Sequence, residues 1–192
     1  MRIIFLILFF FQTILWAHSE SDYGGLLSGL FHPIIGPDHL VVILGVGIWG
    51  YKMSKPSVWI LPLAFITAML LGAAIGTISM PLYSVEIVIA FSGIFLGLLI
   101  AMDEDFPLWI SIPVVVTFAL FYGFAHGVET PEGATTLIYM LGFLIASALL
   151  IFLGITIAKL LKKYFNSNLG AQIFDVLISL TGSLVLINIL LA

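Results

Sequence analysis

Three histidines and three carboxylates of this sequence lie within or beside long apolar segments. They are His32, Asp38, His39, Glu86, His126 and Glu129. Ionisable side chains are costly inside a membrane, and their presence there points to function. Imidazole together with carboxylate suits nickel, cobalt, zinc, copper or iron, so these residues predict a site for a divalent transition metal. The chain has no cysteine, which excludes thiolate ligands and disulfides.

The first motif, HPIIGPDH at residues 32–39, predicts a broken helix. Each proline lacks a backbone donor and collides with the preceding helical turn. Broken backbone persists at membrane depth only where it is buried in protein or lines a cavity, and transporters place their binding sites at such breaks. We expect the break between Pro33 and Pro37, with Pro37 at the first position of the second half. Asp38 and His39 would then lie in its first turn.

The second motif, FYGFAHGVE at residues 121–129, places His126 and Glu129 on one face of a helix, because they are three residues apart. Structural interpretations stay open. The polar residues of the first motif could form a hydrogen-bonded network, and Glu86 and Glu129 could lie among lipid headgroups. The acidic run at residues 103–105 is most simply a solvated loop, with a role in metal release as the alternative.

The composition indicates that the lipid bilayer is the solvent of this chain. Of the 192 residues, 62% are hydrophobic and 8% are charged, with a mean hydropathy of +1.27. A soluble domain carries about 25% charged residues. Only helices and closed barrels span a bilayer, and long unbroken apolar runs favour helices over a barrel. No nucleic-acid partner is expected.

The N-terminus has the features of a signal peptide. Arg2 precedes an apolar run at residues 3–11, and Ala17 is a small residue at the expected cleavage position. We expect cleavage after Ala17, so that residues 1–17 are removed; an uncleaved first helix is the alternative. His18 would then offer an α-amine and an imidazole as a bidentate chelate for a metal, unless it belongs to a flexible solvated tail.

Six further segments are long and apolar enough to cross a bilayer as helices, which takes about 20 residues each. They are residues 25–51, 58–80, 84–102, 108–129, 135–161 and 171–191. No soluble domain is left over. The expected fold is therefore an all-α integral membrane protein, a bundle of six transmembrane helices formed by residues 18–192 after a cleaved signal peptide, with the first helix broken at Pro33–Pro37.

The lysines predict the orientation of these spans. Lys52 and Lys55 lie between the first two spans, and residues 159–163 carry the other three lysines between the last two. The positive-inside rule places both groups in the cytoplasm. The mature N- and C-termini are then periplasmic. The outer half of the membrane then contains all six ionisable residues named above, His32, Asp38, His39, Glu86, His126 and Glu129.

Small residues four apart predict close helix packing within the bundle. Gly72 and Gly76 form one such pair, and Gly93 and Gly97 form another.

The two motifs resemble those of the HupE/UreJ proteins. The first matches in His, Pro, Gly, Asp and His, with Gly45 and Gly47 downstream; the second usually has His where this chain has Tyr122. The signal peptide, size and six-span plan also fit. This difference at Tyr122 affects only one possible extra metal ligand. The resemblance implies a nickel or cobalt permease of a family often encoded beside hydrogenase or urease functions, with metal-handling residues His32, Asp38, His39, His126 and Glu129, and Glu86 at a less secure acidic position.

Together these features predict transport of Ni²⁺ or Co²⁺ across the bacterial inner membrane into the cell. The ion is the substrate; no prosthetic group and no enzymatic activity are expected. Without an ATP-binding motif, transport would be facilitated or secondary. The alternatives are an intramembrane metalloenzyme and a non-transporting metal-binding accessory subunit for hydrogenase or urease maturation. A homo-oligomer or a metallochaperone partner stays open, as does the choice between nickel and cobalt.

Overall fold

The computed structural model describes residues 25–53, 56–78, 84–102, 104–128, 130 and 134–165. This part of the chain is helical and contains no strand. Its helices are α2 (Gly25–Ile35), α3 (Pro37–Lys52), α4 (Ser57–Gly76), α5 (Ser84–Ala101), α6 (Leu108–Val128) and α7 (Thr136–Phe165).

These helices agree with the first five expected spans. The helices α4, α6 and α7 are each long and apolar enough to cross a membrane, and α2 and α3 together form a fourth, bent candidate. The apolar part of α5, Ile87–Ala101, is shorter. The expected signal peptide at residues 1–17 and the sixth span at residues 171–191 lie outside the described residues and stay predictions.

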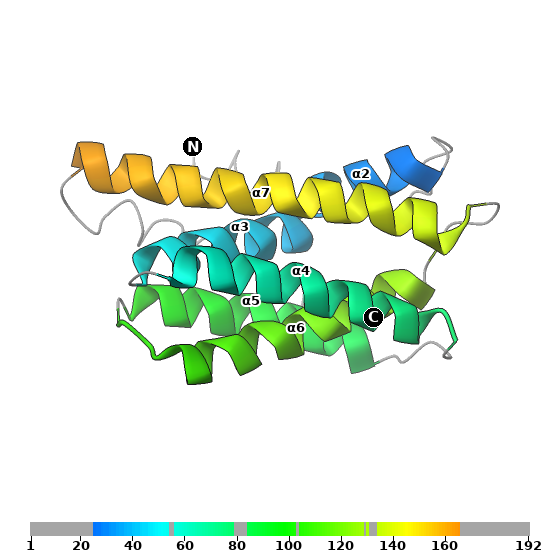
Figure 1. Cartoon of the computed structure of the whole chain (residues 1–192), viewed down its shortest axis with the longest axis horizontal. Coiled ribbons are helices and arrows are strands. Elements are labelled where there is room, and N and C mark those ends of the chain that lie inside the picture. Colours follow the sequence, from blue (N-terminus) through cyan, green and yellow to red (C-terminus); the bar gives the residue numbers. More distant parts are fainter. Residues whose placement is uncertain are drawn as a thin grey trace, which may run out of the picture.

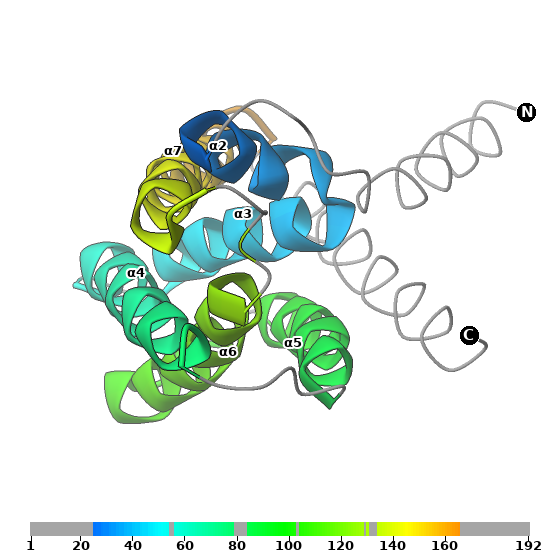
Figure 2. The same cartoon turned by 90° about the vertical axis from the view of Figure 1, so that its right-hand side faces the viewer.

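The helix α3 lies at the centre of the bundle, with α2 and α7 on one side and α4, α5 and α6 on the other (Figure 2). Every residue from Val41 to Gly50 is buried. A helix that is apolar all round is suited to such a position, because it has no face that must meet water. The central helix therefore carries Asp38 and His39 into the middle of the structure.

Glycines allow the helices to pack backbone against backbone. A Cβ atom at Gly72 or Gly76 of α4 would overlap the carbonyls of Leu120 and Phe124 in α6. In return, a Cβ atom at Gly123 would overlap the Met69 carbonyl. The predicted packing role of the first glycine pair is confirmed, and it explains why α4 and α6 run closely side by side (Figure 1).

One end of the bundle has the character of a membrane–water interface. The Nζ atom of Lys52 donates a hydrogen bond to the Ile100 carbonyl at 2.6 Å, which joins the ends of α3 and α5. The exposed rings of Trp59 and Trp109 lie at the beginnings of α4 and α6, and that of Tyr164 lies at the end of α7. Aromatic and basic residues gather at membrane interfaces. We call this the lysine-bearing end.

Candidate metal centre

The first span is broken at Gly36. The axes of α2 and α3 make an angle of 78°, and Pro37 begins α3 as expected. A residue before proline is driven out of the helical region, and Gly36 accordingly has φ −72° and ψ 107°. Pro33 remains inside the last turn of α2, so the break is narrower than the predicted interval from Pro33 to Pro37.

Asp38 and His39 occupy the first turn of α3, as the sequence predicts. The Oδ1 atom of Asp38 lies 2.9 Å from Nδ1 of His39. An ionised carboxylate can only accept hydrogen bonds, so it favours the tautomer with hydrogen on Nδ1 and leaves the Nε2 lone pair of His39 available. Metal-binding histidines are commonly oriented by a carboxylate in this way.

Three histidines from three helices meet beside this turn. His32 comes from α2, His39 from α3 and His126 from α6, and one possible ligand nitrogen from each lies within 4.8 Å of the others. The Nε2 atoms of His39 and His126 are 2.8 Å apart. His126 is 1% exposed and His39 is 8% exposed. Within the described part of the chain, these three imidazoles are the group that could hold a metal ion.

Aromatic side chains surround the three histidines, which we call the histidine cluster. The Phe143 ring lies 4.4 Å from that of His126 and 5.9 Å from that of His32, and Tyr139 lies 6.1 Å from His32. Both come from α7, and sequence reasoning did not find them. Their spacing of four residues was the available signal, but many apolar helices contain such pairs. These rings surround the cluster with apolar atoms, and electrostatic interactions are strong in such surroundings.

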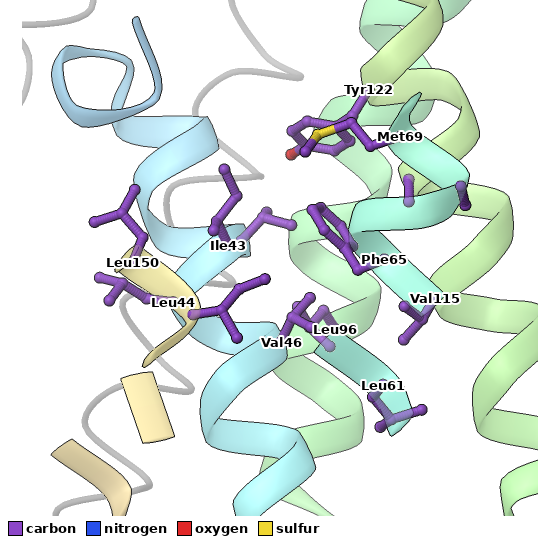
Figure 3. Packing of buried hydrophobic residues seen from close by; sticks show 14 of the residues in the cluster. Ile43, Leu44, Val46, Leu61, Phe65, Met69, Leu96, Val115, Tyr122 and Leu150 are labelled. Carbon is purple, nitrogen blue, oxygen red and sulfur yellow. The ribbon is translucent and has the colours of Figure 1, made fainter. Parts of the chain in front are cut away.

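Apolar side chains fill the bundle between the histidine cluster and the lysine-bearing end. Figure 3 shows Ile43 of α3 facing Phe65 and Met69 of α4, with Val46 and Leu96 further along. Ile43, Phe65 and Met69 are fully buried. The cluster therefore lies near the other end of the bundle, with a packed apolar layer below it.

The remaining predicted site residues are not placed in the cluster. His18 and Glu129 lie outside the described residues. Glu86 lies in the first turn of α5, but its side chain is outside the described part. Since Lys52 joins the C-terminal ends of α3 and α5, α5 must begin at the same end of the bundle as the cluster.

Comparisons with known proteins relate the chain to one family. The family model described as HupE / UreJ protein matches residues 6–185. A relative named Protein HupE, from Rhizobium leguminosarum bv. viciae, is 38% identical over 148 residues, which covers 77% of this chain and 78% of the relative. No solved structure matches the chain. This membrane protein therefore belongs to the HupE/UreJ family.

Proposed function

We propose that this protein carries Ni²⁺ or Co²⁺ from the periplasm into the cytoplasm across the bacterial inner membrane. The observation that carries the proposal is the convergence of His32, His39 and His126 from three separate helices. Imidazole is a good ligand for both metals. Membership in the HupE/UreJ family connects the protein with nickel and cobalt, and the ion is a substrate rather than a prosthetic group.

The contact between His39 and His126 explains how the cluster accepts a cation. In the metal-free protein one of the two facing Nε2 atoms holds a hydrogen that the other accepts. A divalent cation would take the place of that hydrogen, and the ring that held it on Nε2 would carry it on Nδ1 instead, so both Nε2 lone pairs face the ion. Asp38 holds the His39 ring in place and contributes negative charge.

Three imidazoles alone leave the double positive charge of the ion poorly compensated. We assign Glu86 and Glu129 to this task, together with Asp38. The expected topology places both glutamates in the same half of the membrane as the histidine cluster. His18, as the first residue after cleavage behind Ala17, would capture the ion at the periplasmic surface. The mature N- and C-termini are periplasmic in this proposal.

Passage inward requires a change of structure. The layer of Ile43, Phe65 and Met69 closes the bundle below the cluster, and a hydrated cation cannot cross packed apolar side chains at acceptable cost. The break at Gly36 joins two helices through a single extended residue. Hinges absorb motion at such places, so we propose that α2 and α3 move relative to each other during transport.

Uptake by vesicles that contain only this protein tests the proposal. Purified protein is reconstituted, and accumulation of radioactive nickel and cobalt is followed at limiting metal. We expect accumulation with the wild-type protein and its loss in His126→Gln, since glutamine hydrogen-bonds but is a poor nickel ligand. Wild-type accumulation in His126→Gln would contradict the site. Metal binding without accumulation would favour the accessory-subunit alternative, and turnover of a membrane substrate would favour the metalloenzyme.

A further inference from the structure

The hydroxyl group of Tyr122 is buried beside the histidine cluster without a hydrogen-bond partner. Tyr122 is 0% exposed, and its oxygen makes no hydrogen bond within the described part of the chain. Buried tyrosine hydroxyls usually find a partner, because an unmade hydrogen bond in an apolar interior is unfavourable. A phenylalanine would fill the same space without this cost, so the hydroxyl needs an explanation.

The position of Tyr122 relates the hydroxyl to the cluster. Tyr122 precedes His126 by four residues on α6, so the two share a helix face. Its ring lies 5.2 Å from that of His39, edge to face. Figure 3 shows the ring beside Met69, with its oxygen turned toward α3. The ring also lies 6.2 Å from that of Phe65, so Tyr122 is next to both the cluster and the layer that closes the bundle.

The polar neighbours do not satisfy this hydroxyl. Asp38 and Ser92 are the polar side chains near enough to act on it. The Ser92 hydroxyl donates to the Ile89 carbonyl at 2.6 Å and makes no hydrogen bond of good geometry with the phenol. Asp38 contacts His39. Among the described residues, the Tyr122 hydroxyl therefore keeps its capacity to hydrogen-bond a further polar group.

We propose that Tyr122 is an additional residue of the metal site, whose oxygen accepts a hydrogen bond from a water molecule bound to the transported cation. The inference rests on the proposed function. Three imidazoles leave open positions on Ni²⁺ or Co²⁺, and water fills positions that the protein does not. A metal-bound water is a strong hydrogen-bond donor, and the Tyr122 ring contacts both His39 of the cluster and Phe65 of the layer that the ion must next pass.

The proposal separates metal binding from folding stability. In Tyr122→Phe, the ring still packs against His39 and Phe65, but the hydroxyl is gone. Metal binding should weaken by about ten-fold or more, the effect of one lost hydrogen bond to a charged group. The metal-free protein should melt at the same or a higher temperature, because an unpartnered buried hydroxyl has been removed. A structural role would lower both quantities.

Calorimetry and cobalt spectroscopy on the purified full-length protein provide the test. Affinity for Ni²⁺ and Co²⁺ and the visible absorption of bound Co²⁺ are measured for the wild type, Tyr122→Phe and Tyr51→Phe. The last variant removes a hydroxyl from the far end of α3 and should match the wild type. In Tyr122→His, an imidazole nitrogen can replace the water, so binding should be at least as tight as in the wild type and the cobalt bands should shift.

Each outcome decides the question. Wild-type affinity and cobalt bands in Tyr122→Phe would overturn the inference alone. So would a weaker affinity that is matched by a lower melting temperature, or a Tyr122→His variant that binds as weakly as Tyr122→Phe. If the wild-type protein binds neither metal, the proposed function fails and the inference falls with it.

Discussion

The Nε2 atoms of His39 and His126 lie 2.8 Å apart although 87 positions separate the two residues in the chain. One belongs to the first turn of the central helix and the other to the last turn of α6. Their contact depends on the break that aims His39 and on the glycine packing that holds α6 against α4. The break and the glycine packing can each be tested by substitutions that leave the metal ligands unchanged.

Asp38→Asn should weaken metal binding by about 10- to 100-fold, the usual effect of losing a group that orients a metal ligand. Asparagine keeps the volume, but it lacks the charge that acts on His39. The measurement is uptake at limiting metal, with protein abundance checked by immunoblot.

Glu104→Gln is the matched control for this charge removal, because Glu104 is exposed near the lysine-bearing end. It should behave as the wild type. Equal uptake in Asp38→Asn and the wild type would show that the charge of Asp38 is not needed for metal handling.

Gly36→Ala should disturb the cluster without unfolding the bundle. A Cβ atom at this position would lie 3.0 Å from Nδ1 of His39 and 3.2 Å from Oδ1 of Asp38, so the two side chains must move. We expect metal affinity to fall by about ten-fold, as for other changes next to metal ligands. Titration with cobalt measures this.

Gly50→Ala tests the same added methyl group at the other end of α3, where the nearest atom would be the Ser57 carbonyl at 3.3 Å. Its metal affinity should be unchanged. An equal loss in both variants would indicate a general effect on α3 rather than a crowded site.

Gly123→Ala should lower the free energy of unfolding by about 1–3 kcal/mol, the usual cost of overpacking. The added methyl group overlaps the Met69 carbonyl and forces α6 away from α4. Thermal unfolding in detergent is the measurement. Ala74→Leu adds a larger group at an exposed position of α4 and should be neutral; equal melting temperatures for both variants would count against backbone-to-backbone packing.

The absence of native cysteine permits a direct test of orientation. Thr135 and Lys162 are exposed before the beginning and near the end of α7. A membrane-impermeant thiol reagent should label Thr135→Cys in intact spheroplasts and Lys162→Cys only after permeabilisation. The reverse pattern would place the histidine cluster on the cytoplasmic side and exclude uptake through it as proposed.

Sequencing the N-terminus of the mature protein should give His18 as the first residue. His18→Ala should then raise the metal concentration needed for half-maximal uptake more than it lowers the maximal rate, because only capture is affected. An intact Met1 would remove the terminal chelate from the mechanism.

The sequence by itself determined the helices and the break. Apolar runs of membrane-spanning length form helices, because lipid offers no hydrogen-bond partners and a helix satisfies its backbone groups internally. Pro37 fixes the start of α3, and the proline restricts Gly36 to an extended conformation. From these two facts and the lysines, the sequence could also place Asp38, His39 and His126 at one end of the bundle.

Only the tertiary structure decided how the helices are rotated about their axes. Lipid and protein interior are both apolar, so the hydrophobic pattern of α6 or α7 does not reveal which face turns inward. The sequence placed His39 and His126 in one predicted site at the same membrane depth, but the contact between their Nε2 atoms follows only from the tertiary structure. For the same reason, the wall formed by Tyr139 and Phe143 and the position of the Tyr122 hydroxyl could not be predicted, since each depends on packing between distant helices rather than on local spacing.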